Sequence, residues 1–81
     1  MPRIIETDSF KKVKSGLDKS FLLRLEKLVQ KIVENPEIGK PMKYERKGTR
    51  EVYLKPFRVS YSYEPNQDTL IFLNVYHKKR Q

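Results

Sequence analysis

The hydrophobic pattern of this chain changes its period near the middle, and this change limits the possible folds more than any other feature. Between Asp18 and Asn35 the apolar residues recur at the three- and four-residue spacing of a helix with one buried face. Pro36 ends this segment, because a proline disfavours the helical conformation of the residue before it. From Arg50 onward, apolar and polar residues alternate as they do in strands. The sequence therefore predicts a helical first half and a sheet in the second half.

Shorter signals complete the predicted order of elements. A strand is expected at residues 3–7, followed by a short helix that Asp8-Ser9 caps and Gly16 ends. In the second half, strands are expected at 50–54, 57–64 and 69–76, with turns at 55–56 and 65–68. Two hairpins then join three antiparallel strands. The predicted fold is α+β in the order β-α-α-β-β-β, one domain over residues 1–81, with both helices on one face of an antiparallel sheet.

The charge balance indicates the class of partner. With 18 Lys and Arg against 10 Asp and Glu, the formal net charge is +8, which favours nucleic acid first and an anionic membrane or acidic protein second. Because the chain has no cysteine and one histidine, disulfides and thiolate metal sites are excluded, and no metal or other cofactor is expected. Neither a signal peptide nor a membrane span is recognisable, so the expected location is the cytoplasm.

Alternation along the strands at 50–54 and 57–64 sorts their side chains onto opposite faces. The set expected to face the helices is Val52, Leu54, Phe57, Val59 and Tyr61. The set expected on the exposed face is Glu51, Tyr53, Arg58 and Ser60. An acid, a phenol and a guanidinium would thus share one surface. The simpler interpretation is a cross-strand charge pair of Glu51 and Arg58 that has no further role.

His77 precedes a run of three cations, Lys78, Lys79 and Arg80. Acid-base cleavage of RNA needs a group that exchanges protons near neutral pH, a cation that stabilises the phosphate charge and a positive surface that holds the backbone. His77 would supply the first, Arg58 the second and this run of cations the third. A solvated terminal histidine is the alternative. Strict alternation places His77 on the face of Ile71, Leu73 and Val75, so either that set faces the active surface or the strand contains a bulge before His77.

Aromatic and basic residues elsewhere have two interpretations each. Tyr44, Tyr53 and Tyr76 would stack on unpaired bases if the chain binds RNA, although aromatic residues of small sheets more often serve packing. The cations of the long helix, Arg24, Lys27 and Lys31, form a stripe that is most simply a solvated face.

Three segments in this order resemble the RelE/ParE superfamily of small toxins from prokaryotic type II toxin-antitoxin modules. They are the helix end "ENPEIGKPMKY", the hairpin "GTREVYLKPFRVSYSY" and the terminus "IFLNVYHKKRQ", and the resemblance covers essentially the whole chain. It implies a RelE-like fold and a cytoplasmic toxin that cuts mRNA in the ribosomal A site by 2′-OH attack, which inhibits translation. The implied partners are a RelB-like antitoxin, in a toxin-antitoxin heterotetramer, and the ribosome with its rRNA and mRNA.

The resemblance also implies roles for particular residues. Arg58 matches the hairpin arginine that stabilises the scissile phosphate, and Tyr76-His77 resembles the YoeB-like ending, in which the histidine is the general acid. RelE carries lysines where this chain has Glu51 and Tyr53, and Lys40 stands where the YoeB-like branch has a glutamate. Glu51 is therefore the first choice of general base, and Glu45 is the second.

The residues expected to bind RNA or the ribosome are Lys43, Tyr53, Tyr76, Lys78, Lys79, Arg80, Arg24, Lys27 and Lys31. Other functions stay open at this point. A ParE-like toxin would poison DNA gyrase without nuclease chemistry. A small basic module would bind nucleic acid without toxicity. Because this chain lacks the strand lysines of RelE, a degenerate and inactive toxin is the remaining alternative.

Overall fold

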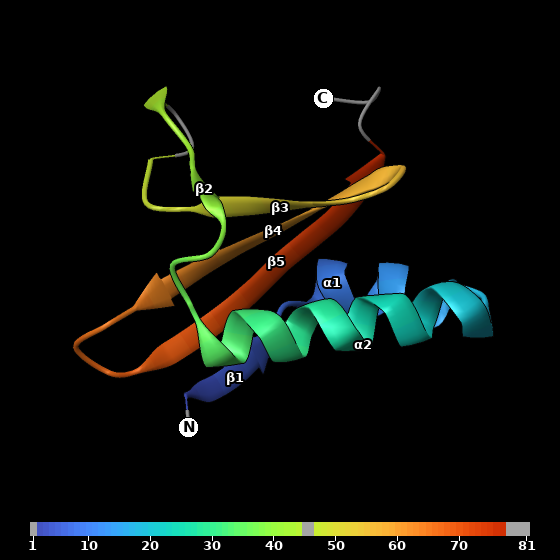
Figure 1. The fold of residues 1–81 in the computed structure, drawn as a ribbon, viewed down its shortest axis with the longest axis horizontal. Helices are drawn as coiled ribbons and strands as arrows, with labels where there is room; N and C mark the ends of the chain where they lie inside the picture. Colours follow the sequence, from blue (N-terminus) through green and yellow to red (C-terminus); the bar gives the residue numbers. More distant parts are fainter. Residues whose placement is uncertain (1, 45–46, 78–81) are drawn as a thin grey trace.

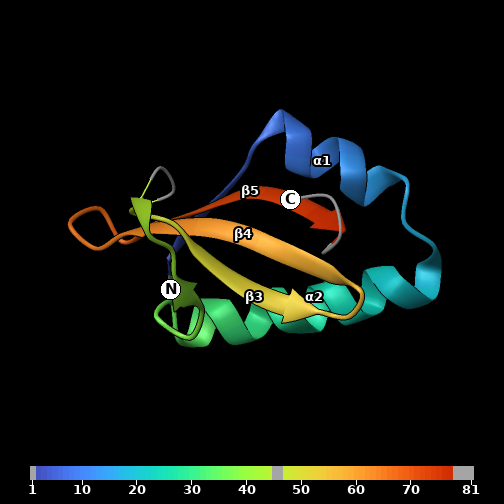
Figure 2. The same ribbon diagram turned by 90° about the horizontal axis from the view of Figure 1, so that it is seen from above.

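The protein forms a layer of two helices against a five-stranded sheet in the computed structural model, which describes residues 2–44 and 47–77 (Figure 1). The elements are β1 (Arg3–Glu6), α1 (Asp8–Ser15), α2 (Lys19–Glu34), β2 (Lys40–Pro41), β3 (Arg50–Leu54), β4 (Phe57–Glu64) and β5 (Thr69–His77). Both helices lie on the same side of the sheet, α1 along β5 and α2 beneath β3 and β4 (Figure 2). The predicted α+β class is confirmed.

The sheet has the strand order β1-β5-β4-β3-β2 and is mostly antiparallel. The two predicted hairpins, β3-β4 and β4-β5, are confirmed. β1 lies at one edge and runs parallel to β5, with Arg3 opposite Thr69. At the other edge the sequence pattern missed β2, which pairs Lys40 with Glu51 and Pro41 with Arg50. A two-residue strand shows no alternation, and proline is depleted in strands because it donates no ladder hydrogen bond.

Helix α2 begins and ends where the sequence indicates. The Asp18 carboxylate accepts a hydrogen bond from the Phe21 amide at 2.7 Å, and Asn35 terminates the helix directly before Pro36. An N-cap of this kind stabilises a helix by about 1 kcal/mol. The long amphipathic helix is therefore confirmed as predicted.

Helix α1 begins one residue earlier than predicted, because Thr7 and not Asp8-Ser9 is its N-cap. The Thr7 hydroxyl accepts from the Phe10 amide at 3.2 Å and donates to the Leu73 carbonyl of β5 at 2.7 Å. Thr7 therefore ends β1 at Glu6 and ties the start of α1 to the sheet. The expected strand at 3–7 is shorter by one residue for this reason.

A bulge in β5 changes which side chains face the helices. Tyr61 lies opposite Phe72 while Ser60 lies opposite Asn74, so the pairing register skips Leu73. One extra residue moves every following side chain to the other face, since side chains alternate with a period of two. The Asn74 side chain accepts a hydrogen bond from the Val75 amide at 2.9 Å, within the irregular segment. A bulge before His77 was one of the two alternatives left by the sequence.

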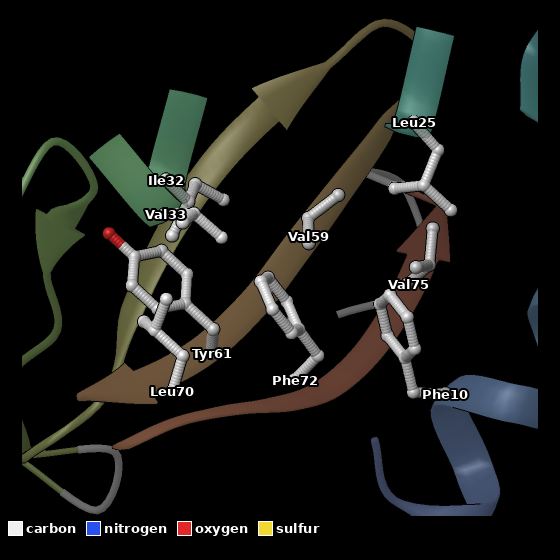
Figure 3. Packing of buried hydrophobic residues seen from close by; sticks show 9 residues of the cluster. All are labelled: Phe10, Leu25, Ile32, Val33, Val59, Tyr61, Leu70, Phe72 and Val75. Carbon is white, nitrogen blue, oxygen red and sulfur yellow. The ribbon is translucent and has the colours of Figure 1, made fainter. Parts of the chain in front are cut away.

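The core fills the space between the helices and the sheet (Figure 3). Its buried members are Phe10, Leu25, Ile32, Val33, Val59, Tyr61, Leu70, Phe72 and Val75. The ring of Phe72 packs between those of Phe10 and Tyr61, at centroid distances of 5.3 and 6.0 Å. Burying one such ring contributes roughly 1.5–3 kcal/mol. Because this core lies on the helix side, the opposite face of the sheet is left for polar residues.

Candidate functional site

Three polar side chains from neighbouring strands meet on the face of the sheet away from the helices. Tyr53 of β3, Arg58 of β4 and Tyr76 of β5 stand opposite one another in the pairing register. Glu51 lies two residues before Tyr53 on β3 and is paired with Ser60. Residues paired across strands point to the same face. The sequence-based expectation that Glu51, Tyr53, Arg58 and Ser60 share a face is therefore confirmed, and Tyr76 joins them.

Glu51 is the centre of this cluster. Its Oε1 accepts a hydrogen bond from Arg58 Nη1 at 3.3 Å, and its Oε2 accepts one from the Tyr76 hydroxyl. The Glu51 side chain is only 5% exposed and that of Arg58 is 32% exposed. The expectation that Glu51 lies at an exposed surface is wrong, because β2 places β3 inside the sheet and two side chains bond to the carboxylate. The Glu51–Arg58–Tyr76 network is thus a partly buried polar network.

Arg58 has a donor that no protein group satisfies within residues 2–44 and 47–77. Its Nε is buried and has no hydrogen-bond partner there. An unsatisfied buried donor costs about 1–3 kcal/mol, and native proteins contain few of them. Such a group is more common where a ligand or water completes the bonding. This observation separates Arg58 from an ordinary surface arginine.

A hollow of about 540 Å³ opens beside this network. The segment from Lys40 to Tyr44 lines one side, and Glu51, Val52, Tyr53 and Arg58 line the other. Tyr44 is 90% exposed and Tyr53 is 52% exposed, while Lys40 and Lys43 are exposed at the same place. The hollow therefore combines cations and aromatic rings, the groups that hold the phosphates and bases of an unpaired strand. Sequence reasoning did not include Lys40 among the binding residues, because the proline after it hides β2.

His77 does not lie beside Arg58, and the sequence-based placement of the two on one face is wrong. His77 is paired with Phe57, and their rings meet edge to face at a centroid distance of 5.6 Å. The Phe57 ring in turn contacts Phe21 of α2, at 5.1 Å. His77 is therefore on the helix side, where it borders a second cavity of about 460 Å³ together with Val13 and Val75. The bulge at Leu73 causes this reversal.

The cations of α2 are also distant from the network. Arg24 lies by the β3-β4 turn, where it donates to the Lys55 carbonyl at 3.1 Å and stacks over Phe21 at 5.1 Å. Lys27 and Lys31 are exposed residues of α2, a helix that lies on the face of the sheet opposite to the network (Figure 1). Of the remaining candidates, Glu45, Lys78, Lys79 and Arg80 lie outside the described residues. The structure thus brings together Arg58, Glu51, Tyr76, Tyr53 and Lys43.

Two further properties bear on the chemistry. Within residues 2–44 and 47–77, no three histidine or carboxylate side chains gather closely enough to hold a metal ion. Neither α1 nor α2, the helices of that part of the chain, has the length and apolar character needed to cross a membrane.

Comparisons with known proteins agree with this architecture. The structure is similar to the toxin of the intact Escherichia coli RelBE toxin-antitoxin complex, with a TM-score of 0.84 and 15% identity, over 99% of this chain and 100% of the other. It is similar to a chain of the RelBE2 complex of Mycobacterium tuberculosis, with a TM-score of 0.84 and 21% identity, over 96% and 100% of the two chains. A YoeB/ParE toxin from Agrobacterium tumefaciens gives a TM-score of 0.82 and 14% identity, over 93% and 96%.

These low identities show a shared fold, and a family model adds the relationship. No curated protein sequence matches the chain significantly. The model of the ParE toxin of type II toxin-antitoxin systems, parDE, matches residues 6–81, which is nearly the whole chain. The protein therefore belongs to the ParE toxin family of type II toxin-antitoxin systems, within the RelE/ParE superfamily.

Proposed function

We propose that this toxin is an endoribonuclease that cuts mRNA in the A site of the ribosome and thereby inhibits translation. The observation that carries the proposal is the Glu51–Arg58–Tyr76 network at the edge of a hollow lined by cations and aromatic rings. In the proposed reaction the ribose 2′-OH gives its proton to Glu51 and its oxygen attacks the adjacent phosphorus, while the bond to the 5′-oxygen breaks and this oxygen takes a proton from solvent water. The products are a cyclic phosphate and a 5′-hydroxyl end.

Arg58 has the main role in this proposal, because negative charge builds up on the phosphate oxygens in the transition state. A fixed guanidinium stabilises that charge more than the charge of the ground state, and this difference lowers the barrier. Glu51 holds one side of the Arg58 guanidinium and so fixes its direction. Since 32% of the Arg58 side chain is exposed at the hollow, the group can still reach a phosphate there.

Glu51 is also the carboxylate nearest to Arg58 and the proposed acceptor of the 2′-OH proton. Its burial and its hydrogen bonds to Arg58 and Tyr76 limit the access of a substrate to this carboxylate, so proton transfer to it would be slow. A ribosome that holds the mRNA in the reactive geometry supplies much of the rate through orientation alone. Tyr76 donates to Glu51 and keeps the carboxylate in place.

The proposed contacts to RNA extend beyond the network. Tyr53 would stack on an unpaired base at the hollow, with Lys43 on a phosphate. The C-terminal cations Lys78, Lys79 and Arg80 and the helix cations Arg24, Lys27 and Lys31 are proposed to contact rRNA. A chain with a net charge of +8 suits a polyanion as large as the ribosome.

The proposed regulator is a RelB-like antitoxin that binds the toxin in the cytoplasm as a heterotetramer. This proposal is supported by the similarity to toxins that were solved as RelBE complexes with their antitoxins. The mass of the complex purified after co-expression with the antitoxin of the same operon tests it.

A second function has one observation in its favour, since the matching family model describes a ParE toxin. A ParE-like toxin would poison DNA gyrase and would need no nuclease chemistry. In that case the Glu51–Arg58 ion pair would be structural. Accumulation of cleaved DNA complexes without loss of mRNA would identify this function.

The experiment that tests the nuclease maps mRNA ends on translating ribosomes by primer extension. The parent protein is compared with Arg58→Ala and with Arg3→Ala, which removes the same charge from the exposed edge strand β1. The parent and the Arg3 variant should cut in the A site, and Arg58→Ala should be slower by about two orders of magnitude or more. A folded parent that leaves mRNA intact on active ribosomes would overturn the proposal.

A further inference from the structure

Lys40 lies on the same face as the Glu51–Arg58–Tyr76 network. It is paired with Glu51 across β2 and β3, and paired residues point to the same side of a sheet. Lys40 also lines the 540 Å³ hollow together with Arg58. The ion pairs among residues 2–44 and 47–77 join Lys14 to Glu6 and Arg58 to Glu51, and neither includes Lys40. Lys40 is thus an exposed residue at the hollow, and no carboxylate of the described residues forms an ion pair with its ammonium group.

The backbone directly before Lys40 is held by hydrogen bonds from two side chains. The Tyr61 hydroxyl, inside the core, donates to the Pro36 carbonyl at 2.8 Å and accepts from the Gly39 amide at 2.9 Å. Arg50 Nη1 donates to the carbonyls of Gly39 and Glu37, at 2.8 and 3.1 Å. A Cβ added to Gly39 would lie 2.7 Å from the Tyr61 hydroxyl oxygen, so the segment fits closely against the sheet.

This anchoring reduces the conformational freedom that Lys40 would lose on binding a ligand. Ordering a long side chain costs up to about 2 kcal/mol, and a mobile backbone would add to that cost. Because Gly39 is buried and bonded on both its N–H and its carbonyl group, the residue after it starts from a fixed position. This fixed backbone reduces the entropy that Lys40 loses when it binds an anion.

The spacing of the two cations limits the ligand. Lys40 and Arg58 are on β2 and β4, with β3 between them and an offset of two residues along the strands, so their backbones are about 12 Å apart. Glu51 lies beside Lys40 in the pairing register and turns its carboxylate to Arg58 and Tyr76. A single phosphate on Arg58 would leave Lys40 unused, while a chain of phosphates would reach both. An exposed aromatic ring beside them, that of Tyr53, suits an unpaired base.

We propose that Lys40 binds the phosphate next to the one held by Arg58, in a single-stranded RNA segment that crosses the hollow. This inference rests on the proposed function in taking RNA as the ligand. Lys40 then contributes to binding and to the register of the strand, and it does not contact the reacting atoms. Its loss should weaken RNA binding while the rate on saturated ribosomes stays close to that of the parent.

A binding measurement without ribosomes tests the inference separately from cleavage. The probe is a fluorescent single-stranded RNA with 2′-O-methyl groups, which cannot be cut, titrated at several salt concentrations. The slope of log affinity against log salt is negative, and each lost phosphate contact on a single strand reduces its magnitude by about 0.7. We expect Lys40→Ala to show this decrease together with an affinity several-fold below that of the parent. The control Lys11→Ala removes an equal charge from α1 and should keep the slope of the parent.

A second variant tests the anchoring while the charge is retained. Gly39→Ala should shift Lys40 and weaken RNA binding nearly as much as Lys40→Ala, provided that its circular dichroism shows a folded protein. If that variant does not fold, Lys40→Ala and its control still decide the question. Equal salt slopes for the parent, Lys40→Ala and Lys11→Ala would overturn the inference.

The outcomes also separate this inference from the proposed nuclease. Binding that depends on Lys40, in a protein that leaves mRNA intact on ribosomes, would support the phosphate site and reject the nuclease. Cleavage by the parent, with a Lys40→Ala variant that binds RNA as the parent does, would reject the phosphate site alone. If the phosphate site and the nuclease are both correct, Lys40→Ala should need a higher toxin concentration for half-maximal cleavage but reach a maximal rate within about twofold of the parent. Arg58→Ala should instead have a much lower maximal rate.

Discussion

Removing Arg58 should affect stability and cleavage by different mechanisms, and a second substitution can separate the two effects. Arg58→Ala takes the ion-pair partner away from a Glu51 carboxylate that is 5% exposed. The Tyr76 hydroxyl continues to donate to this carboxylate. Changing Glu51 to Gln in the same chain removes the buried charge and keeps a side chain of nearly the same shape. The double variant should therefore regain stability without regaining the guanidinium.

The size of the effect follows from the burial of the two partners. Breaking a fully buried ion pair costs about 3–5 kcal/mol, and exposed pairs contribute about 0–1 kcal/mol. Because the Arg58 side chain is 32% exposed, we expect Arg58→Ala to lower the free energy of unfolding by an intermediate amount, roughly 1–3 kcal/mol. In a domain of this size, that loss lowers the melting temperature by about 5–20 °C.

Urea unfolding measures the stability of the parent, Arg58→Ala and Glu51→Gln/Arg58→Ala, and mRNA end mapping on ribosomes measures cleavage for the same proteins. We expect the double variant to recover at least half of the lost stability and to remain inactive, because it lacks both the guanidinium and the carboxylate that is the proposed proton acceptor. Recovery of cleavage together with stability would refute a direct role of Arg58 in the reaction. The ion pair would then be the structural charge pair that is the simpler interpretation of the sequence.

Three other substitutions test the remaining parts of the structure. His77→Ala should cleave mRNA at a rate within about twofold of that of the parent, because His77 packs on Phe57 on the face opposite to the network. A cleavage rate on ribosomes that is lower by two orders of magnitude would contradict this placement. Tyr61→Phe should lose about 1–2 kcal/mol in urea unfolding at neutral pH, since it removes the bonds to Pro36 and Gly39. Burial raises the pKa of Tyr61 above its usual value. The stability that the neutral phenol contributes is therefore complete below pH about 10 and is lost as the pH rises through the raised pKa. If the parent and the Tyr61→Phe variant lost the same free energy of unfolding at alkaline pH, this reasoning would be contradicted. Phe72→Ala should cost about 3–5 kcal/mol, because its ring is fully buried between Phe10 and Tyr61, and an unchanged midpoint in urea would contradict the described core.

Local patterns were sufficient for most of the fold. The bounds of β3 and β4 agree with the alternation of apolar residues, and α2 agrees with the helical spacing between Asp18 and Asn35. These elements are long, and each has one buried face, so the periodic signal is strong. β2 was missed because Lys40 and Pro41 form a strand only through pairing with β3, a contact that is distant in sequence. The same limit explains why Lys40 was not recognised as part of the site.

Alternation placed Glu51, Tyr53 and Arg58 on one face correctly, and the prediction failed only for the last residues of β5. The reason is one extra residue. Up to Phe72 the strand keeps its phase with β4, but the register skips Leu73, and an inserted residue has no signature in a run of apolar side chains. Tyr76 and His77 therefore lie on the faces of the sheet opposite to those that strict alternation predicts.

The bulge also links the start of the chain to the candidate active site. The Leu73 carbonyl accepts a hydrogen bond from the Thr7 hydroxyl, 66 residues away, and the same oxygen of Thr7 caps α1. Packing of α1 on β5 thus supports the conformation that turns Tyr76 to Glu51 and His77 to Phe57. Without the bulge the pairing would continue with Leu73 opposite Ser60, so that Val75 would stand opposite Arg58 in place of Tyr76, and His77 would share that face. The bulge that places Tyr76 beside the Glu51–Arg58 pair is therefore stabilised by a long-range contact from the N-cap of the first helix to the last strand.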